Sequence, residues 1–259
     1  MSYKNLTISF ATHGHDGFGS QYLRKIAGWA FCWHSERRRY RYIHTPFIKL
    51  DHLSNEEVSV MNDFVGIPDT RKGRKIHVRK PFLPQVHLNA NSFFDSSFLQ
   101  TVKNCYFSTP KPKTENEIVI HIRRNDLHLR RKRKRDVHGT AHKRMCSNEY
   151  YSKAIPLIMK DNSNDKIVII SDAVRDELSP IFDKWSYSMI SSVKVEARSD
   201  IRKSFHSMVM AKKLFLARSC FSYIAGLLNE SEVYFQDGFC NRQTKVPLNH
   251  WKNWNEYVN

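Results

Sequence analysis

An apolar, strand-like run around His121 ends in two adjacent arginines, Arg123 and Arg124, with Asp126 two residues further on. Arginine presents a planar fork of N–H donors that matches phosphate oxygens, and it keeps its charge when partly buried. Ligands of open α/β sheets bind at the carboxyl ends of the strands, where these arginines fall. Successive strand residues face opposite sides, so one arginine reaches a ligand while the other organises the sheet or loop. The segment predicts an anion site, the alternative being a pair of arginines bridged to Asp126 and Asp172.

A glycine-containing segment near the amino terminus is the second candidate site. It comprises His15, Asp16, Gly17, Gly19 and Gln21 and lies between a strand pattern and a helical pattern. Glycines in a turn let backbone N–H groups approach a substrate closely, and the Gln21 amide is able to orient a hydroxyl group. Asp16 is able to act as a general base, but Asp is also a common turn residue, so an ordinary tight turn is the alternative.

A third candidate segment lies near the carboxyl end of the chain. Ser219, Phe221 and Ser222 follow an apolar run and open a helical pattern. Serine hydroxyls and the amino terminus of a helix offer hydrogen-bond donors to a diphosphate. The alternative is an ordinary helix cap at Ser219.

The elements that must position these residues alternate between strand and helix patterns. Strands are predicted over 6–10, 40–47, 117–123, 166–171, 193–197, 214–219 and 232–236. Helices are predicted over 21–33, 54–64, 148–159, 173–183, 201–211 and 221–228, with a glycine turn over 13–20 and an irregular stretch over 66–95. Such alternation implies right-handed βαβ units and a parallel sheet. With a proline- and lysine-rich linker over 108–113, the sequence predicts an α/β protein of two Rossmann-like halves, 1–110 and 111–259.

The charge of the chain is strongly basic and unevenly distributed. The 259 residues include 42 Lys/Arg against 25 Asp/Glu, a formal net charge of +17 that favours anionic or phosphorylated partners. Ten of the basic residues and two acidic ones lie between 123 and 144. The densest part, Arg130–Arg135, is typical of a nucleic-acid patch but lacks the interleaved aromatic residues of single-strand binders. A loop that closes over a diphosphate and a solvated charged loop are the alternatives.

Composition excludes several other classes of protein. With 41% hydrophobic residues, wholesale disorder is excluded. Five cysteines without a C-x-x-C pair indicate a reducing compartment. The sequence contains neither an apolar run of membrane-spanning length nor a signal-peptide pattern, so a soluble, cytoplasmic protein without membrane insertion is expected, such as a bacterial or viral one. Neither zinc spacing nor an Asp-x-Asp pair occurs, so we expect a metal-free site.

The segment His121-x-Arg123-Arg124-x-Asp126 matches the His-x-Arg-Arg-x-Asp motif of the fucosyltransferase superfamily, which includes α1,2- and α1,6-fucosyltransferases that use GDP-fucose. Three further segments occur along the chain in the same order as in the family. They resemble the Gly-Gly-x-Gly-Asn-Gln turn at 16–21, the strand ending in Ser-Asp at 169–172 and the Asn-Ser-Thr-Phe-Ser-Trp-Trp segment at 216–225, with departures at Asp16 and Ser20 in the first. The resemblance spans about residues 10–225 in motif order rather than in residue identity.

This resemblance implies a GT-B-type enzyme, with two Rossmann-like halves, a cleft between them and the nucleotide sugar held mainly by the second half. It implies that His121 contacts the guanine or ribose, that Arg123 contacts the β-phosphate, and that Arg124 assists the diphosphate or the fold. The other residues assigned to the donor site are Asp126, Asp172, Ser219, Phe221 and Ser222. The implied reaction is inverting transfer to a glycan hydroxyl, with fixed arginines stabilising the departing diphosphate without a metal.

Two departures from the family leave parts of this hypothesis open. Ser204 stands where relatives often carry an acidic residue that helps to read guanine, so another donor such as UDP-xylose is the alternative. The basic run follows Asp126 where some relatives carry a catalytic carboxylate, which leaves the general base unassigned. Residues able to accept the proton are Asp16, which is the first choice, and His13, His15, His128, Asp126 and Asp136.

The sequence therefore predicts a glycosyltransferase, in first place a fucosyltransferase, with a nucleotide sugar and a glycan as partners and no cofactor. Two rival hypotheses remain. One is a basic RNA- or DNA-binding protein that uses 123–144 as its contact surface. The other is a degenerate transferase that binds glycan as a lectin-like module and never turns over.

Overall fold

A computed structural model of the chain describes two compact units. The described residues are 6–9, 17–34, 40–42, 44–50, 53–67, 75–77, 86, 88–114, 118–124, 145–160, 166–173, 175–183, 185, 187–191, 200–236 and 247–254. The first unit is Met1–Lys111 with Asn241–Asn249, and the second is Pro112–Cys240 with His250–Asn259. The division after Lys111 falls within the proline- and lysine-rich stretch.

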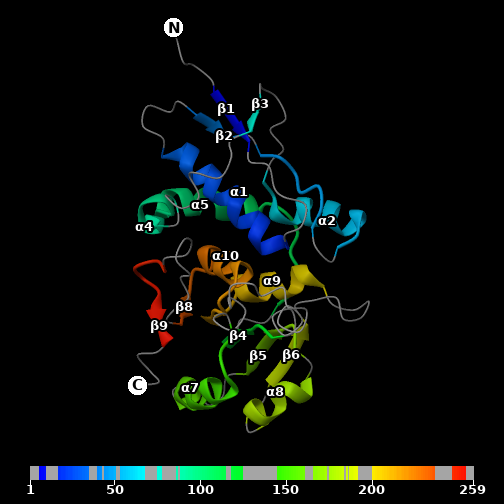
Figure 1. Cartoon of the computed structure of the whole chain (residues 1–259), viewed down its shortest axis with the longest axis vertical. Helices are drawn as coiled ribbons and strands as arrows, with labels where there is room; N and C mark the ends of the chain where they lie inside the picture. The colour runs from blue at the N-terminus through cyan, green and yellow to red at the C-terminus, as the bar shows by residue number, and fades with distance from the viewer. Residues whose placement is uncertain are drawn as a thin grey trace, which may run out of the picture. The chain divides into compact units, whose positions relative to one another are not determined.

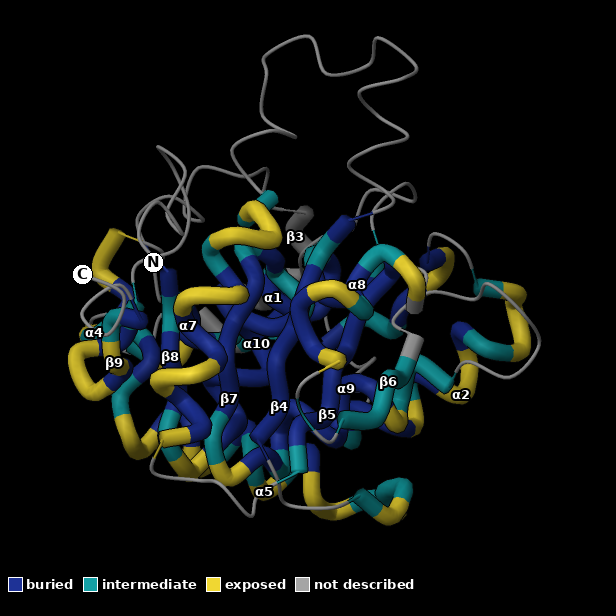
Figure 2. Tube along the Cα trace, turned by 90° about the horizontal axis from the view of Figure 1, so that it is seen from below, coloured by how far each residue is buried: buried dark blue, intermediate teal, exposed yellow. Residues whose placement is uncertain are grey.

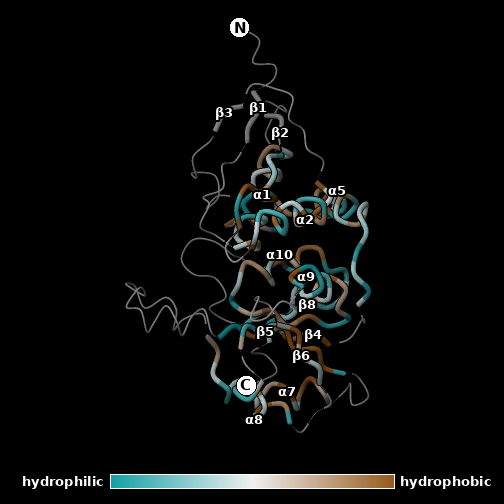
Figure 3. The backbone as a smooth tube through the Cα atoms, turned by 90° about the vertical axis from the view of Figure 1, so that its right-hand side faces the viewer, coloured by the Kyte–Doolittle hydropathy of each residue, from teal (hydrophilic) through white to brown (hydrophobic). Residues whose placement is uncertain are grey.

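The first unit contains a three-stranded parallel sheet in the order β2-β1-β3. Its strands are β1 (Leu6–Ser9), β2 (Tyr40–Tyr42) and β3 (Lys75–His77). Its helices are α1 (Phe18–Trp33), α2 (Asn55–Val65), α4 (Ala90–Phe93) and α5 (Ser96–Phe107). Hydrophobic and hydrophilic residues are interspersed along α1 and α2 in Figure 3, as expected for helices that bury one face.

Local sequence signals explain both ends of α2. The Ser54 hydroxyl accepts a hydrogen bond from the Glu57 N–H at 3.3 Å, and Glu57 accepts one from the Ser54 N–H at 2.7 Å. This is the capping box expected from the sequence. The helix ends at Gly66, whose φ of 67° lies in the left-handed region, and a Cβ there would lie 1.9 Å from the Cys105 carbonyl oxygen. Glycine is therefore required at this position.

The second unit contains a six-stranded parallel sheet in the order β6-β5-β4-β7-β8-β9. The strands are β4 (Ile118–Ile122), β5 (Ile167–Ser171), β6 (Tyr187–Ser191), β7 (Lys213–Phe215), β8 (Glu232–Phe235) and β9 (Lys252–Asn253). This is the 3-2-1-4-5-6 order of dinucleotide-binding sheets. The chain runs from β4 outward to β6 and then returns to the other side of β4 with β7. The topological switch point, where such sheets bind ligands, therefore lies between β4 and β7.

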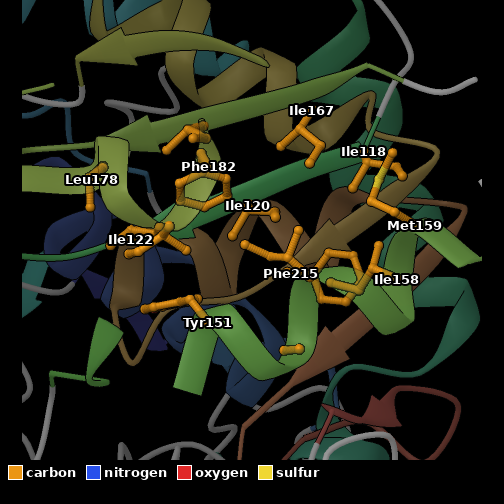
Figure 4. Packing of buried hydrophobic residues seen from close by; sticks show 14 of the residues in the cluster. Ile118, Ile120, Ile122, Tyr151, Ile158, Met159, Ile167, Leu178, Phe182 and Phe215 are labelled. Atoms are coloured by element: carbon orange, nitrogen blue, oxygen red, sulfur yellow. The ribbon is translucent and has the colours of Figure 1, made fainter. Parts of the chain in front are cut away.

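Helices cover both faces of this six-stranded sheet (Figure 1). They are α7 (Asn148–Lys160), α8 (Arg175–Phe182), α9 (Ile201–Val209) and α10 (Cys220–Leu228). Ile118, Ile120 and Ile122 of β4 pack against residues of α7 and α8 in one hydrophobic cluster (Figure 4). The central strands β4 and β5 are buried along their whole length, whereas the edge strand β6 is half-buried (Figure 2). The hydrophobic core thus holds the central strands β4 and β5 in place, and the switch point lies beside β4.

The expected α/β class, with parallel sheets in both halves, is confirmed. The bounds of some predicted elements need correction. Helix α1 begins at Phe18, where a turn was expected, and the stretch expected to be irregular includes β3 and α4. Strand β6 at Tyr187–Ser191 was not predicted, and the strand predicted at 193–197 lies outside the described residues and stays a prediction. Short apolar runs in a sequence indicate that a strand or helix is present more reliably than they indicate where it begins and ends.

Within the described part of the chain, every helix is too short or too polar to cross a bilayer.

Asn229 joins α9 to the end of α10, and we expect its replacement to destabilise the second unit. Its Nδ2 donates to the carbonyl oxygens of Met208, Val209 and Ala211 at 3.1, 3.0 and 2.9 Å. Asn229→Asp puts a carboxylate against these buried acceptors, so the free energy of unfolding should fall by about 2 kcal/mol or more. Chemical denaturation checks this against Asn104→Asp on the exposed face of α5, which should change it by less than about 0.5 kcal/mol. Equal losses for the two variants would contradict the assignment.

Candidate functional site

The tandem arginines follow β4 directly and have different environments. Arg124 is 3% exposed, whereas Arg123 is only partly buried. Because successive strand residues face opposite sides, Arg124 lies on the same side of the sheet as Ile122, which packs on α7 and α8. Arg123 lies on the same side as His121. The expectation that the two arginines divide between opposite sides of the sheet agrees with these contacts.

Arg124 is occupied by contacts within the second unit. Its Nη2 donates to the Asn148 side chain at 2.9 Å, and its Nη1 donates to the Arg123 carbonyl at 3.3 Å. The guanidinium lies 5.4 Å from the centroid of the Tyr151 ring, and its Nε lies 3.9 Å from a Glu177 carboxylate oxygen. A buried guanidinium with this set of partners organises the end of β4 against α7 and α8. Of the two roles expected for Arg124, these contacts favour the fold over the diphosphate.

Asp172, which directly follows β5, positions the arginine segment. It is 4% exposed, and its Oδ1 accepts the backbone N–H of Arg124 at 2.5 Å. The bond ties the carboxyl ends of β4 and β5 together, next to the pair Ile122 and Ser171 in the sheet register. This hydrogen bond joins Asp172 to the backbone of the arginine segment. A contact of Asp172 with the donor stays a prediction.

His121 and Phe221 face each other between β4 and α10. The His121 ring is 3% exposed and packs edge-to-face on Phe221, with ring centroids 5.8 Å apart. The Phe221 ring in turn packs against the Phe205 ring of α9, with ring centroids 5.5 Å apart. Ser204, at the position considered for reading the base, is fully buried in the same helix. A guanine or ribose contact for His121 stays a prediction.

Ser219 and Ser222 both engage the backbone at the start of α10. Ser219 caps the helix, accepting the Phe221 N–H at 3.2 Å. Ser222 is fully buried, and its hydroxyl donates to the Ala217 carbonyl at 3.0 Å. The hydroxyl donor of Ser222 is thus directed into the turn, and a contact of Ser219 or Ser222 with a diphosphate stays a prediction. Helix α10 begins at the switch point, so its amino terminus faces the region in which a diphosphate was expected.

Arg218 is a charged residue of this site that reasoning from sequence missed. It lies between β7 and the Ser219 cap and is partly buried. Arg218 and Arg124 both lower the pKa of the Cys146 thiol, which burial raises overall, and both act in the same direction on Tyr151. The Cys146 thiol donates to the Gln236 side chain, beyond the end of β8, at 2.5 Å. Arg218 lies three residues beyond the end of β7 and directly precedes Ser219, the N-cap of α10.

The glycine segment of the first unit has a different conformation from the expected turn. Gly17 is the N-cap of α1, with φ at −68° and open space where a Cβ would lie, so glycine is not required there. Gly19 and Gln21 are buried residues of the helix itself. The Gln21 Nε2 donates to the Lys49 carbonyl at 2.6 Å, which gives this amide a structural partner. The reason is that α1 starts three residues earlier than its apolar period indicates.

Lys25, one turn further along α1, should make stability depend on pH. It is 1% exposed, and its ammonium donates to the Thr45 carbonyl. Burial lowers the pKa of Lys25 from 10.5 to about 8. Between pH 8 and 10.5 the unfolded chain keeps the proton on Lys25, whereas the folded chain has released it. The buried charge therefore destabilises the fold fully below pH 8, and this destabilisation decreases as the pH rises. The free energy of unfolding of the wild type relative to Lys25→Met should rise by about 1 kcal/mol per unit from pH 8 to 10 in urea titrations; a constant difference would contradict this.

Several predicted residues lie outside the described part of the chain. They are His13, His15, Asp16, Asp126, His128, Asp136 and the basic run Arg130–Arg135. The choice of general base and the role of the basic run therefore stay predictions. Among the residues that the structure describes, His, Cys, Asp and Glu side chains form no group of three or more able to hold a metal ion.

Comparison with known proteins finds a distant structural similarity. The sequence matches no family model, and it matches no curated protein. The chain is similar to a solved structure of POFUT1 in complex with GDP, with 11% sequence identity over 88% of this chain and 97% of that chain and a TM-score of 0.46.

Proposed function

We propose that the chain is an inverting, metal-independent glycosyltransferase that moves a sugar from a nucleotide donor, most simply L-fucose from GDP-fucose, to a hydroxyl of a glycan. The observation that carries this proposal is where the His-x-Arg-Arg segment falls in the sheet. In a parallel sheet of 3-2-1-4-5-6 order, Arg123 directly follows the strand that borders the switch point. Helix α10 begins across the same switch point, so a cation and a helix amino terminus meet where an anionic ligand would bind.

In the proposed reaction the acceptor oxygen attacks the anomeric carbon while the bond from that carbon to the diphosphate oxygen breaks. The electron pair of this bond leaves with the nucleoside diphosphate, and the acceptor proton passes to a general base, for which Asp16 is the first candidate. Arg123 stabilises the negative charge that grows on the diphosphate. Arg124 and Asp172 contribute by holding the segment that carries Arg123.

Thermal-shift measurements with GDP and with UDP, each with and without EDTA, test the donor site. A ligand that binds only the folded state stabilises it by about 2.7 kcal/mol at a concentration 100 times its dissociation constant. We expect a GDP-selective shift that survives EDTA and disappears in Arg123→Ala. Lys160→Ala removes an exposed cation from the far end of α7 and should retain the shift.

Other outcomes separate the alternatives. A UDP-selective shift would keep the site and change the donor. A shift that EDTA abolishes would contradict metal independence. Glycan binding without donor hydrolysis would indicate the lectin-like alternative. If neither nucleotide shifts the melting temperature and the protein binds RNA in a salt-sensitive manner, the nucleic-acid-binding alternative would replace the transferase.

A further inference from the structure

We propose that the first unit carries a binding surface for uncharged oligosaccharides, formed where the carboxyl end of α1 meets α4 and the start of α5, with Trp33 as its main contact. This inference rests on the proposed function and deepens it, because a transferase that acts on a glycan must also hold that glycan. The proposed surface belongs to the first unit, whereas the residues assigned to the donor site belong to the second unit.

Aromatic rings from three helices meet at this surface, and Figure 1 shows α4 and α5 beside α1. Trp33 packs edge-on against Phe98 of α5, with ring centroids 6.0 Å apart. Phe31 of α1 stacks with Phe93 of α4 at 6.5 Å, and the His34 ring lies 5.8 Å from Phe93 and 6.4 Å from Phe98. Because these contacts join the three helices, the rings are held in place and lose little conformational entropy when a ligand binds.

Several of these side chains remain accessible although they pack on one another. Trp33 is 45% exposed, and Phe31 and Phe93 are partly exposed. Leu88, two residues before α4, is also exposed. Large apolar side chains that gather at one exposed place mark an interaction site. The C–H groups on one face of a sugar ring form an apolar surface, and this surface packs well on an aromatic ring.

The segment that supplies α4 and the first turns of α5 is poor in charge. Residues 81–102 contain one Asp and no Lys or Arg, although the chain has 42 Lys/Arg among its 259 residues. The carboxylate of that residue, Asp95, lies 3.4 Å from a ring nitrogen of His34 and caps α5. The exposed polar side chains in the described part of the segment are amides and hydroxyls, namely Asn89, Ser92, Ser96, Ser97 and Gln100. Such groups exchange hydrogen bonds with sugar hydroxyls, whereas nucleic acids bind mainly through Lys/Arg, so the surface suits an uncharged ligand.

The surface lies away from the carboxyl ends of the first sheet. Strands β1 and β2 are parallel and α1 lies between them in the chain, so α1 returns the chain from the carboxyl end of β1 to the amino end of β2. With 16 residues, α1 is about 24 Å long. Because parallel sheets bind their ligands at the carboxyl ends, Trp33 at the last position of α1 holds a part of the glycan remote from the reacting hydroxyl. Its loss should therefore weaken binding of the acceptor and leave turnover at saturating acceptor unchanged.

The test applies the whole chain to an array of neutral oligosaccharides of glucose, galactose, mannose and N-acetylglucosamine, with sulfated and sialylated glycans and a single-stranded RNA as charged probes. Isothermal titration calorimetry then measures the affinity for the glycans that bind. We expect binding of neutral oligosaccharides, and binding that is about 10-fold weaker or more in Trp33→Ala. Trp33→Phe keeps an aromatic ring and should lose less.

Phe107→Ala is the matched control, because Phe107 is also an aromatic residue that is 45% exposed, at the other end of α5. Its glycan affinity should equal that of the wild type. Leu88→Ala changes a second exposed side chain of the surface and should weaken binding, by less than Trp33→Ala does. Melting curves identify any variant that fails to fold, and if Trp33→Ala does so, Leu88→Ala decides. Donor hydrolysis and the thermal shift with GDP should be the same in the wild type and in every variant.

The outcomes distinguish this inference from the proposed function. Glycan affinities of Trp33→Ala and Leu88→Ala within twofold of the wild type would refute the surface and leave the proposed function intact. A thermal shift with GDP in a chain that binds no neutral oligosaccharide would do the same. Binding of only the sulfated, sialylated or RNA probes would contradict an uncharged ligand. A wild-type dimer that Trp33→Ala converts to a monomer would show that a second copy covers the surface, and it would refute the proposal. Glycan binding that depends on Trp33, without a shift by GDP or UDP, would support the surface and remove the transferase.

Discussion

Arg123→Ala should lower the turnover of donor hydrolysis and sugar transfer by about 100- to 1,000-fold, the cost of removing one fixed donor that acts on developing negative charge. The expectation follows from the position of Arg123 at the end of the central strand, beside the switch point of a fully parallel sheet. Because charge on the diphosphate grows as the bond to the sugar breaks, the loss should appear in kcat and in the affinity for released GDP more than in the apparent affinity for the intact donor. Initial rates with GDP-fucose and with UDP-xylose, over a range of donor concentrations, provide the measurement.

Two comparisons make this prediction specific. Arg123→Lys retains the charge and should retain more activity than Arg123→Ala, without the full rate, because the planar fork is lost. Lys160→Ala, an equal change in net charge on the exposed end of α7, should keep the wild-type rate. Turnover by Arg123→Ala equal to that of the wild type would exclude the assigned role.

Arg124→Ala should have its main effect on stability and lower the free energy of unfolding by about 3 kcal/mol. The substitution removes a side chain that is only 3% exposed, its hydrogen bond to Asn148 and its contact with the Tyr151 ring. Loss of a buried side chain of this size leaves a cavity, and loss of the cation–π contact and hydrogen bond adds to the cost. Urea denaturation followed by circular dichroism measures the change.

The matched control for this prediction is Arg202→Ala in α9. Arg202 is bonded to the Asp200 carboxylate at 2.9 Å, but its side chain is 42% exposed. Solvent screens such a pair, so its loss should cost less than about 1 kcal/mol. The two adjacent arginines should thus separate, Arg123 in turnover and Arg124 in stability. A stability loss for Arg124→Ala no larger than that for Arg202→Ala would contradict the structural role.

The two units also differ in what their polar residues do. In the first unit, Gln21 and Lys25 lie on the buried side of α1 and are bonded to the carbonyl groups of Lys49 and Thr45. Such bonds satisfy backbone acceptors between elements and need no ligand to explain them. In the second unit, Arg123 follows β4 and helix α10 begins after the neighbouring strand β7, at the carboxyl ends of both strands. The second unit is therefore the better place to search for bound anions.

Much of the fold could be predicted from the sequence because its signals are local. The β-branched runs that became β4 and β5, the capping box at Ser54 and the strand–helix alternation each act over a few residues. Alternation also limits the topology to parallel sheets, and it places the arginine segment at a strand end. The sequence by itself thus determined the fold class and the principal candidate segment.

Only the tertiary structure decided which residues share the site. The order of the strands is set by long-range pairing, and the pairing of β4 with β7 brings Phe221 against His121 although the two lie far apart along the chain. The extent of burial distinguishes Arg123 from Arg124. The residues around Arg124 come from α7 and α8, and no local sequence pattern identifies them as its neighbours. The start of α1 at Phe18 likewise placed Gly19 and Gln21 inside a helix. Side chains adjacent in sequence point to opposite faces of a sheet, whereas neighbours across strands share an edge, and so pairing between strands determines the site.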